Sequence, residues 1–219
     1  MTDRVAANPP SLAACGLTVE ESRTIVRKIR PIFATHVAQY DTGKYWPDVY
    51  DRVLAAFRDP DLPSAQSLDE ALRWKYGHLG KPRIPEAHRR LIAQIQRTWP
   101  HGAPELSRSP EAAFELLNAT FGGAKRFVTM GFLLHLLFPA RIPIIDQHNF
   151  RAVNALVRSV RPTWQGRTTP SRYADIELVR DVIDAIVAAW SVEHPASTPS
   201  VRELDKFLMM YGKSLKRAV

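Results

Sequence analysis

A single carboxylate, Asp146, stands in a long basic stretch of the sequence. It is the only acidic residue between Glu115 and Asp175, whereas residues 125–172 carry eight lysines and arginines. Asp146 follows the apolar run 142–145 and opens a predicted helix. An acid that is only a solvated surface charge usually lies among other acids, and Asp146 does not. We therefore interpret Asp146 as a candidate catalytic group that acts on a polyanion.

Two simpler interpretations of Asp146 stay open. Aspartate is a good helix N-cap, and a capping role is compatible with catalysis. Asp146 and His148 could suggest a metal, but two ligands without further partners are a weak signal, and we expect no metal and no cofactor. His135 lies in an apolar helical pattern and is interpreted as a packed core histidine.

The elements that must position Asp146 are predicted to be helices. Helix-start signals occur at Thr18, Ser67, Ser200 and the pair Ser109-Pro110. Apolar residues then recur at spacings of three and four, and no long alternating run indicates a sheet. The predicted helices cover residues 18–38, 46–58, 67–77, 85–99, 110–119, 124–138, 147–160, 173–192 and 200–216. The sequence thus predicts an all-α protein, with a flexible N-terminus at 1–17 and a single helical domain at 18–219.

A second basic zone, residues 73–108, contains eight lysines and arginines interleaved with aromatic residues. Such a mixture suits a surface that holds phosphates and stacks exposed bases. Trp74 and Tyr76 are our candidates for an aromatic pocket that receives a base. For each aromatic residue of this zone, packing into the core is the alternative.

Composition limits the function classes. The chain has 219 residues and a net charge of +8, which favours a polyanionic partner such as DNA, RNA or an anionic membrane surface. No apolar stretch is long enough for a membrane span, and no secretory signal is apparent. The single cysteine, Cys15, excludes an internal disulfide and a cysteine-ligated cluster. We expect a cytoplasmic monomer.

The segment around Asp146 resembles the helix-hairpin-helix DNA glycosylase superfamily, which includes endonuclease III. A helix at 112–119, a glycine turn at 121–123, an apolar helix at 125–138 and a proline-containing link lead to the pattern Asp146-x-His148-x-x-Arg151. The likeness covers about residues 118–156, within a hairpin and catalytic segment at about 110–160. It implies two helical lobes with a helix-hairpin-helix element and a DNA-binding cleft between them. It also implies that Asp146 is catalytic and that DNA is contacted by Gly122, Gly123, Arg126, His148 and Arg151.

The chain differs from that family at the hairpin. Bifunctional members carry a lysine shortly after the hairpin, which attacks the sugar as an amine. Lys125 lies three residues from the matching register, which Val128 occupies. We keep Lys125 as a second catalytic candidate, and we favour a monofunctional enzyme that uses water.

Three hypotheses follow. The first is a DNA glycosylase that flips a damaged or modified base out of double-stranded DNA and hydrolyses its N-glycosidic bond, leaving an abasic site. Its substrate class is open and includes hypermodified cytosine in phage DNA. The second is a non-catalytic helical DNA-binding module, and the third is an RNA-binding protein that uses residues 73–101.

Overall fold

The protein is built from helices. The computed structural model describes residues 16–41, 47–58, 63–122 and 126–217, and these residues form helices and no strand, which confirms the all-α prediction. The elements are α1 (Val19–Asp41), α2 (Pro47–Ala56), α3 (Ala65–Lys75), α4 (Glu86–Thr98), α5 (Glu105–Arg108), α6 (Pro110–Phe121), α7 (Phe127–Leu137), α8 (Gln147–Val160), α9 (Tyr173–Glu193), η2 (Pro195–Ser197) and α10 (Val201–Arg217). Most residues of the predicted flexible N-terminus lie outside the described residues.

Three of the predicted helix starts are confirmed by their hydrogen bonds. At α1 the Thr18 N–H donates to Glu21 Oε2 at 2.7 Å, and the Glu21 N–H donates to Thr18 Oγ1 at 3.2 Å. Ser200 and Glu203 make the same reciprocal pair at α10. Ser109 caps α6 by accepting from the Ala112 N–H, with a proline at the first helical position.

The start of α3 was wrongly predicted at Ser67. The helix begins earlier, and Ser64 is its N-cap, because the Ser64 hydroxyl accepts from the Ser67 N–H at 3.1 Å. Both serines lie in one short polar stretch, and either could supply a capping oxygen. The short elements α5 and η2 also escaped prediction, since neither is long enough to show an apolar periodicity.

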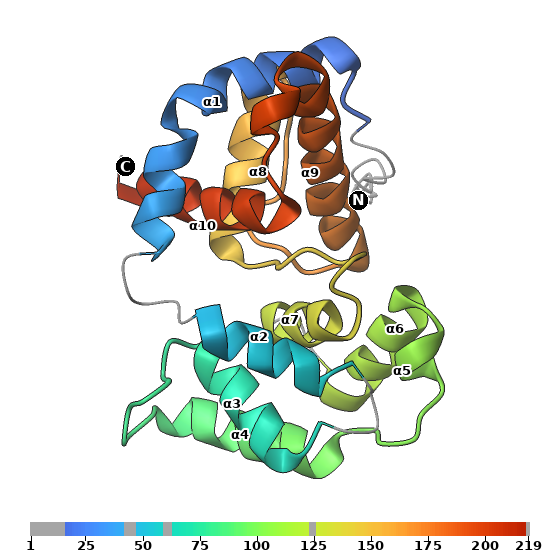
Figure 1. Ribbon diagram of the computed structural model, residues 1–219. Helices are drawn as coiled ribbons and strands as arrows, with labels where there is room; N and C mark the ends of the chain where they lie inside the picture. Colours follow the sequence, from blue (N-terminus) through green and yellow to red (C-terminus); the bar gives the residue numbers. More distant parts are fainter. Residues whose placement is uncertain (1–15, 42–46, 59–62, 123–125, 218–219) are drawn as a thin grey trace, which may run out of the picture.

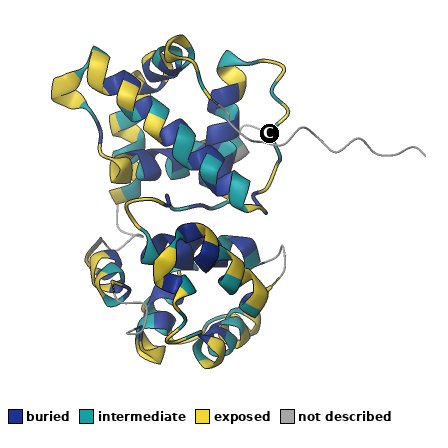
Figure 2. Cartoon of the chain, turned by 90° about the vertical axis from the view of Figure 1, so that its right-hand side faces the viewer, coloured by how far each residue is buried: buried dark blue, intermediate teal, exposed yellow. Residues whose placement is uncertain are grey.

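The helices form two groups (Figure 1). Helices α1, α8, α9 and α10 pack against one another in the group that is uppermost in this view. Helices α2 to α7 form the lower group, in which α3 packs on α2, α4 and α7 and α6 packs on α5 and α7. Buried side chains face the interior of each group, and exposed ones lie on its outer surface (Figure 2). None of the described helices combines the length and apolar character that crossing a membrane requires.

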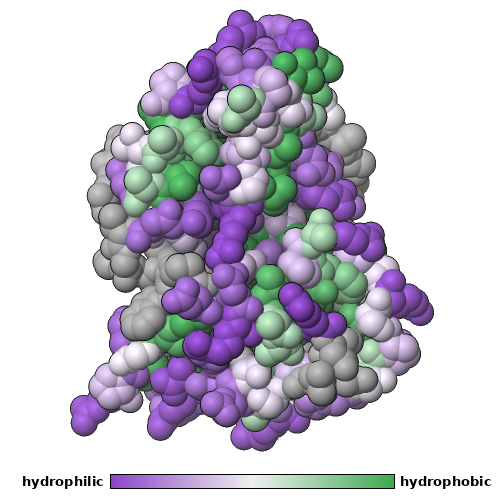
Figure 3. Space-filling view, in the orientation of Figure 1, coloured by the Kyte–Doolittle hydropathy of each residue, from purple (hydrophilic) through white to green (hydrophobic). Residues whose placement is uncertain are grey.

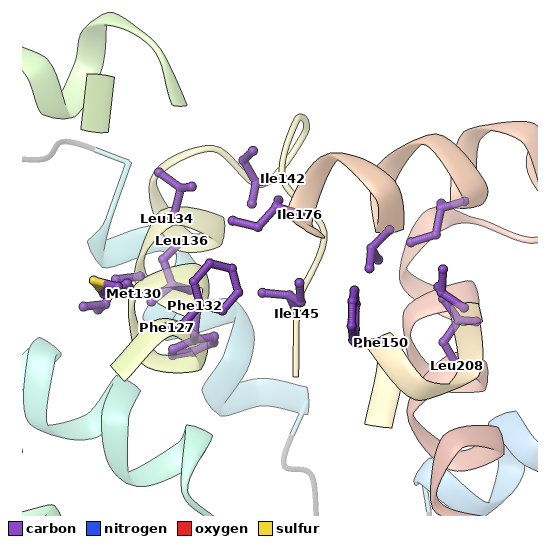
Figure 4. Packing of buried hydrophobic residues seen from close by; sticks show 14 of the residues in the cluster. Phe127, Met130, Phe132, Leu134, Leu136, Ile142, Ile145, Phe150, Ile176 and Leu208 are labelled. Atoms are coloured by element: carbon purple, nitrogen blue, oxygen red, sulfur yellow. The ribbon is translucent and has the colours of Figure 1, made fainter. Parts of the chain in front are cut away.

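The link between α7 and α8 joins the two groups. Its residue Ile145 is fully buried and lies between Phe132 of α7 and Phe150 of α8 (Figure 4). The close approach to α7 depends on Gly131, because a Cβ at that position would lie 2.5 Å from Ile145 Cγ2. Burial of one isoleucine side chain stabilises a fold by about 1.5–3 kcal/mol. This anchored residue directly precedes Asp146.

Candidate functional site

A pocket of about 330 Å³ lies where the two groups of helices meet. We call it the Asp146 pocket. Its walls come from α1, α2, α3 and α7, from the link, and from the first turns of α8 and α10. In the space-filling view, polar residues predominate along the middle of the face, at the level between the two groups (Figure 3). The pocket therefore combines residues that are far apart in the sequence.

Asp146 is both the N-cap of α8 and a wall of this pocket. Its Oδ1 accepts the His148 N–H at 2.6 Å and the Asn149 N–H at 2.9 Å. Its second oxygen, Oδ2, has no hydrogen-bond partner within the described residues. The capping interpretation is thus correct, and it engages only one oxygen. The helix N-terminus holds the carboxylate in a fixed orientation beside the pocket.

Lys75, the last residue of α3, brings a positive charge to the same pocket. Its Nζ donates to the Ile145 carbonyl at 3.3 Å and lies 5.3 Å from the centre of the Phe132 ring. Burial lowers the pKa of Lys75, while Asp146 and Asp205 act in the opposite direction. Lys75 therefore ties the lower group of helices to the residue that precedes Asp146.

A second carboxyl group, Asp205 of α10, also lines the pocket. Its residue is 8% exposed, and its Oδ1 has no hydrogen-bond partner within the described residues. Burial raises the pKa of Asp205 to about 8, and the negative charge of Asp146 adds to the effect. The Ile144 backbone amide and Lys75 lower it. At neutral pH the Asp205 carboxyl consequently holds its proton.

Three buried polar atoms of the pocket lack a partner among the described residues. They are Trp74 Nε1, Asn149 Oδ1 and Asp205 Oδ1. The orientation of the Asn149 amide is fixed, because its Nδ2 donates to the Ile144 carbonyl at 3.1 Å. The pocket thus presents a donor at Trp74, an acceptor at Asn149 and a carboxyl at Asp205. A buried polar group without a partner is unfavourable, so this set is suited to a bound polar ligand.

Aromatic side chains form much of the remaining wall. The Trp74 ring is stacked 5.6 Å from Phe132 and lies 5.4 Å from Tyr50. The Tyr50 hydroxyl contacts His135 Nε2 at 2.5 Å, and His135 Nδ1 contacts the Ile142 carbonyl at 2.6 Å. Since a carbonyl only accepts, Nδ1 carries the proton and Nε2 accepts from Tyr50. Burial lowers the pKa of His135 to about 4, so this histidine is neutral.

His135 is therefore the packed histidine that the sequence predicted, and it also lines the pocket. Two cations of α10 complete the wall on that side, and each is bound to an acid. Arg202 pairs with Asp51 at 3.0 Å, and Lys206 pairs with Asp41 at 2.7 Å. These ion pairs connect α10 to α2 and to the end of α1.

The structure brings two of the predicted site residues, Asp146 and Trp74, to this pocket. Tyr76, the other candidate for a base pocket, is not part of its lining. The Tyr76 hydroxyl contacts Thr129 Oγ1 at 2.7 Å, and its ring stacks on His88 at 4.3 Å. Tyr76 leaves the helical register at the end of α3, and its side chain therefore packs against α7 and α4.

The predicted DNA contacts at the hairpin lie around the turn between α6 and α7. Gly122 adopts a φ of +23° and ends α6, with its N–H donating to the Asn118 carbonyl at 2.9 Å. Arg126 Nη1 donates to the Phe121 carbonyl at 2.8 Å. Gly123 and Lys125 lie outside the described residues, so their predicted roles stay predictions.

His148 and Arg151 lie on α8 beside α10. Arg151 Nη1 donates to the Gly212 carbonyl at 3.1 Å and lies 3.3 Å from His148 Nδ1. At Gly212 the helices approach so closely that a Cβ would lie 2.0 Å from the His148 carbonyl oxygen. The Asp-x-His-x-x-Arg pattern thus includes the contact that fixes the first turn of α8 on α10.

The basic zones are used partly for internal contacts. In the zone around Asp146, Arg161 pairs with Glu21 at 2.6 Å, and Arg126 and Arg151 bind carbonyl groups. In residues 73–108, Trp99 is only 5% exposed and packs 5.8 Å from Phe57, as the core alternative predicted. Several cations of the two zones remain exposed, namely Lys81, Arg83, Arg97, Arg108, Arg141, Arg158 and Arg172.

Sequence reasoning missed three polar groups of the pocket: Lys75, Asn149 and Asp205. Two of them had a readable signal. Lys75 falls in the buried register of α3, with Leu68, Ala71 and Leu72, and Asp205 falls in that of α10, beside Leu204 and Leu208. A charged residue in an apolar helix register indicates either an internal partner or a functional site.

The described residues contain no group of three or more histidines, cysteines, aspartates or glutamates that could hold a metal ion. Comparisons of the chain with protein-family models, with curated proteins and with solved structures find no match.

Proposed function

We propose that this protein is a DNA glycosylase, which hydrolyses the bond between a flipped base and deoxyribose. The observation that carries the proposal is the position of Asp146. Its carboxylate is fixed by the amides of α8 and lines a pocket of about 330 Å³, and its Oδ2 has no hydrogen-bond partner among the residues that the structure describes. A carboxylate beside the departing base stabilises the positive charge of the sugar and orients the attacking water.

The lining of the pocket supports recognition of a base. A base can be processed only after it leaves the stack, and enzymes hold it by stacking and by hydrogen bonds to its edge. Trp74 and Tyr50 provide aromatic walls. Trp74 Nε1, Asn149 Oδ1 and Asp205 Oδ1 are buried polar atoms without a partner among the described residues. This mixture of donor and acceptor matches a heterocycle that carries both.

The partner in this proposal is double-stranded DNA. The net charge of +8 and the exposed cations of both basic zones favour a phosphate backbone. The hairpin of the resemblance would be α6 and α7, which pack against each other on either side of Gly122. The Gly122 N–H itself donates to the Asn118 carbonyl at the end of α6.

Hydrolysis by water is the reaction we favour over an amine-driven lyase. Lys75 is the pocket amine nearest to the link, and its Nζ is held by the Ile145 carbonyl. We assign it the task of holding the link in place and balancing the charge of Asp146. Borohydride reduction during turnover should therefore trap no enzyme–DNA adduct. An adduct that disappears in Lys75→Gln would instead assign a lyase step to Lys75.

The alternative is a DNA-binding module without catalysis. A module that only binds phosphate gains nothing from a carboxylate in a basic region, because the carboxylate repels the backbone. Asp146→Asn distinguishes the two functions, since asparagine caps a helix as well as aspartate does. Removal of the charge should leave folding unchanged, leave DNA binding equal or stronger, and lower base release by about 10²-fold or more.

The assay is alkali-revealed strand scission of modified DNA, with Asp181→Asn as the matched control. Asp181 lies on α9 and pairs with Arg180 at 3.1 Å, and it is not part of the pocket. We expect the control to retain full activity. Equal scission by wild type and Asp146→Asn would refute the proposal.

A further inference from the structure

The two carboxyl groups of the Asp146 pocket differ in their surroundings. Asp146 is half-buried and accepts two backbone N–H groups at the start of α8. Asp205 is buried on α10, and its Oδ1 has no partner among the described residues. Paired carboxyl groups in one site commonly divide the work when their surroundings favour opposite charge states. One then acts as an anion and the other as an acid.

We infer that Asp205 donates a proton to the base as the bond between base and sugar breaks. The inference rests on the proposed function, because it assigns an acid to the same reaction. It is carried by the position of Asp205 in the pocket wall and by its Oδ1, which has no hydrogen-bond partner in the described part of the chain.

The other polar groups of the pocket are less suited to this task. Trp74 Nε1 is a donor that does not ionise in water, and Asn149 Oδ1 is an acceptor. Lys75 already donates to the Ile145 carbonyl, and Lys206 is paired with Asp41. Asp205 is the pocket residue that combines a transferable proton with a carboxyl oxygen that has no hydrogen-bond partner among the described residues. Its pKa, raised to about 8 by burial, keeps that proton available at neutral pH.

The step balances without a further reagent. The Asp205 O–H proton passes to a ring nitrogen or carbonyl oxygen of the base, and the C1′–N bond breaks with its electron pair going to the base. Water adds to C1′ of the sugar cation and loses one proton, for which Asp146 is the nearby acceptor. The products are a neutral free base and an abasic sugar. Asp146 then releases its proton to solvent, and the Asp205 carboxylate regains one from solvent.

Several charged or titratable groups line the pocket together with Asp205. Helix α3 contributes Lys75, the start of α8 contributes Asp146, and α2 and α7 contribute Tyr50 and His135. Helix α10 itself contributes Arg202 and Lys206. Tyr50 and His135 stay neutral near pH 7, because burial raises the pKa of Tyr50 to about 12 and lowers the pKa of His135 to about 4. Asp205 is accordingly the carboxyl whose charge changes as the pH passes through about 8.

The test is the pH dependence of base release under single-turnover conditions. The probe is a set of genomic DNAs of differing base modification, from which the free base released by wild type is identified by mass spectrometry. The rate constant of wild type should fall as the pH rises through about 8, because the acid form is lost. Asp205→Asn should be slower by about 10²–10⁴-fold and should lack this fall, whereas Asp205→Glu should restore it in part.

Three results would overturn the inference in distinguishable ways. If wild type releases no base from any DNA, the proposed function fails as well. Asp205→Asn could release base as fast as wild type, or more slowly but with the same pH profile. Either result would refute the role of Asp205 as the acid and leave the proposed function standing. If the variant does not fold, carbon-13 NMR of the aspartate carboxyl groups in wild type still decides. The Asp205 signal must be that of a protonated carboxyl at neutral pH, and a carboxylate signal there refutes the inference.

Discussion

The buried carboxyl of Asp205 should make the stability of this protein depend on pH in an unusual direction. Its folded-state pKa is about 8, compared with an ordinary value of 3.8. Between these two values the folded chain holds a proton that the unfolded chain releases. The free energy of unfolding therefore falls as the pH rises from about 4 to about 8, because the unfolded state binds fewer protons in that window. Most buried carboxylates with ion-pair partners give the opposite trend.

The magnitude follows from the shift. A group that is protonated only in the folded state changes the free energy of unfolding by about 1.4 kcal/mol per pH unit. Asp205→Asn removes this group and leaves the others in place. The free energy of unfolding of Asp205→Asn, relative to that of wild type, should increase by about 3 kcal/mol between about pH 5 and about pH 7.5. A constant difference in packing cancels, because only the change with pH is compared.

The measurement is urea unfolding of both proteins at several pH values, followed by circular dichroism. Asp181→Asn, on the surface of α9, is the control and should differ from wild type by a constant amount. If the difference between Asp205→Asn and wild type does not change with pH, Asp205 is ionised in the fold. Its role as an acid would then be excluded.

Three further predictions concern the surroundings of Asp146. In the Asp205→Asn variant, the free energy of unfolding should rise by roughly 3 kcal/mol from about pH 4 to about pH 6.5. The reason is that burial lowers the pKa of His135 from 6.5 to about 4, so protonation of His135 opposes folding in this window. Adding His135→Gln should abolish the rise, as measured by urea unfolding. Gly212→Ala should destabilise the protein by about 1–3 kcal/mol and lower base release, because its Cβ would lie 2.0 Å from the His148 carbonyl oxygen. Ser214→Ala, at a neighbouring exposed residue, is the control and should change the free energy of unfolding by less than about 0.5 kcal/mol. Equal effects of Gly212→Ala and Ser214→Ala would contradict the close contact between Gly212 and His148. Lys75→Gln should lower the rate of base release, because Lys75 holds the Ile145 carbonyl next to Asp146. Wild type should nevertheless form no borohydride-trapped adduct with DNA, because Lys75 does not attack the sugar.

The sequence was sufficient to predict the helices and the place of Asp146. Capping residues such as Thr18 and Ser200 specify helix starts through local hydrogen bonds, which do not depend on the rest of the fold. The same locality explains Asp146, since its backbone contacts are two and three residues away. Local hydrogen bonds thus made most of the helix starts predictable, with Ser67 as the exception, where Ser64 caps the helix instead.

The composition of the pocket could not be predicted in the same way. Asp205 lies 59 positions after Asp146, and only the packing of α10 on α8 brings them together. Lys75 was read as one cation of a basic zone, although its register in α3 places it inside. Tyr76 follows Trp74 by two positions, yet only Trp74 lines the pocket, because side chains two residues apart along a helix point to different sides and Tyr76 contacts Thr129.

The central claim is that Asp146 serves the release of a base from DNA. The most direct measurement is mass spectrometry of free bases after wild type or Asp146→Asn is incubated with genomic DNAs of differing modification. Our account predicts one released base with wild type and at least about 10²-fold less with the variant, at equal folding and DNA binding. No released base from any DNA, or equal release by the two proteins, would contradict it.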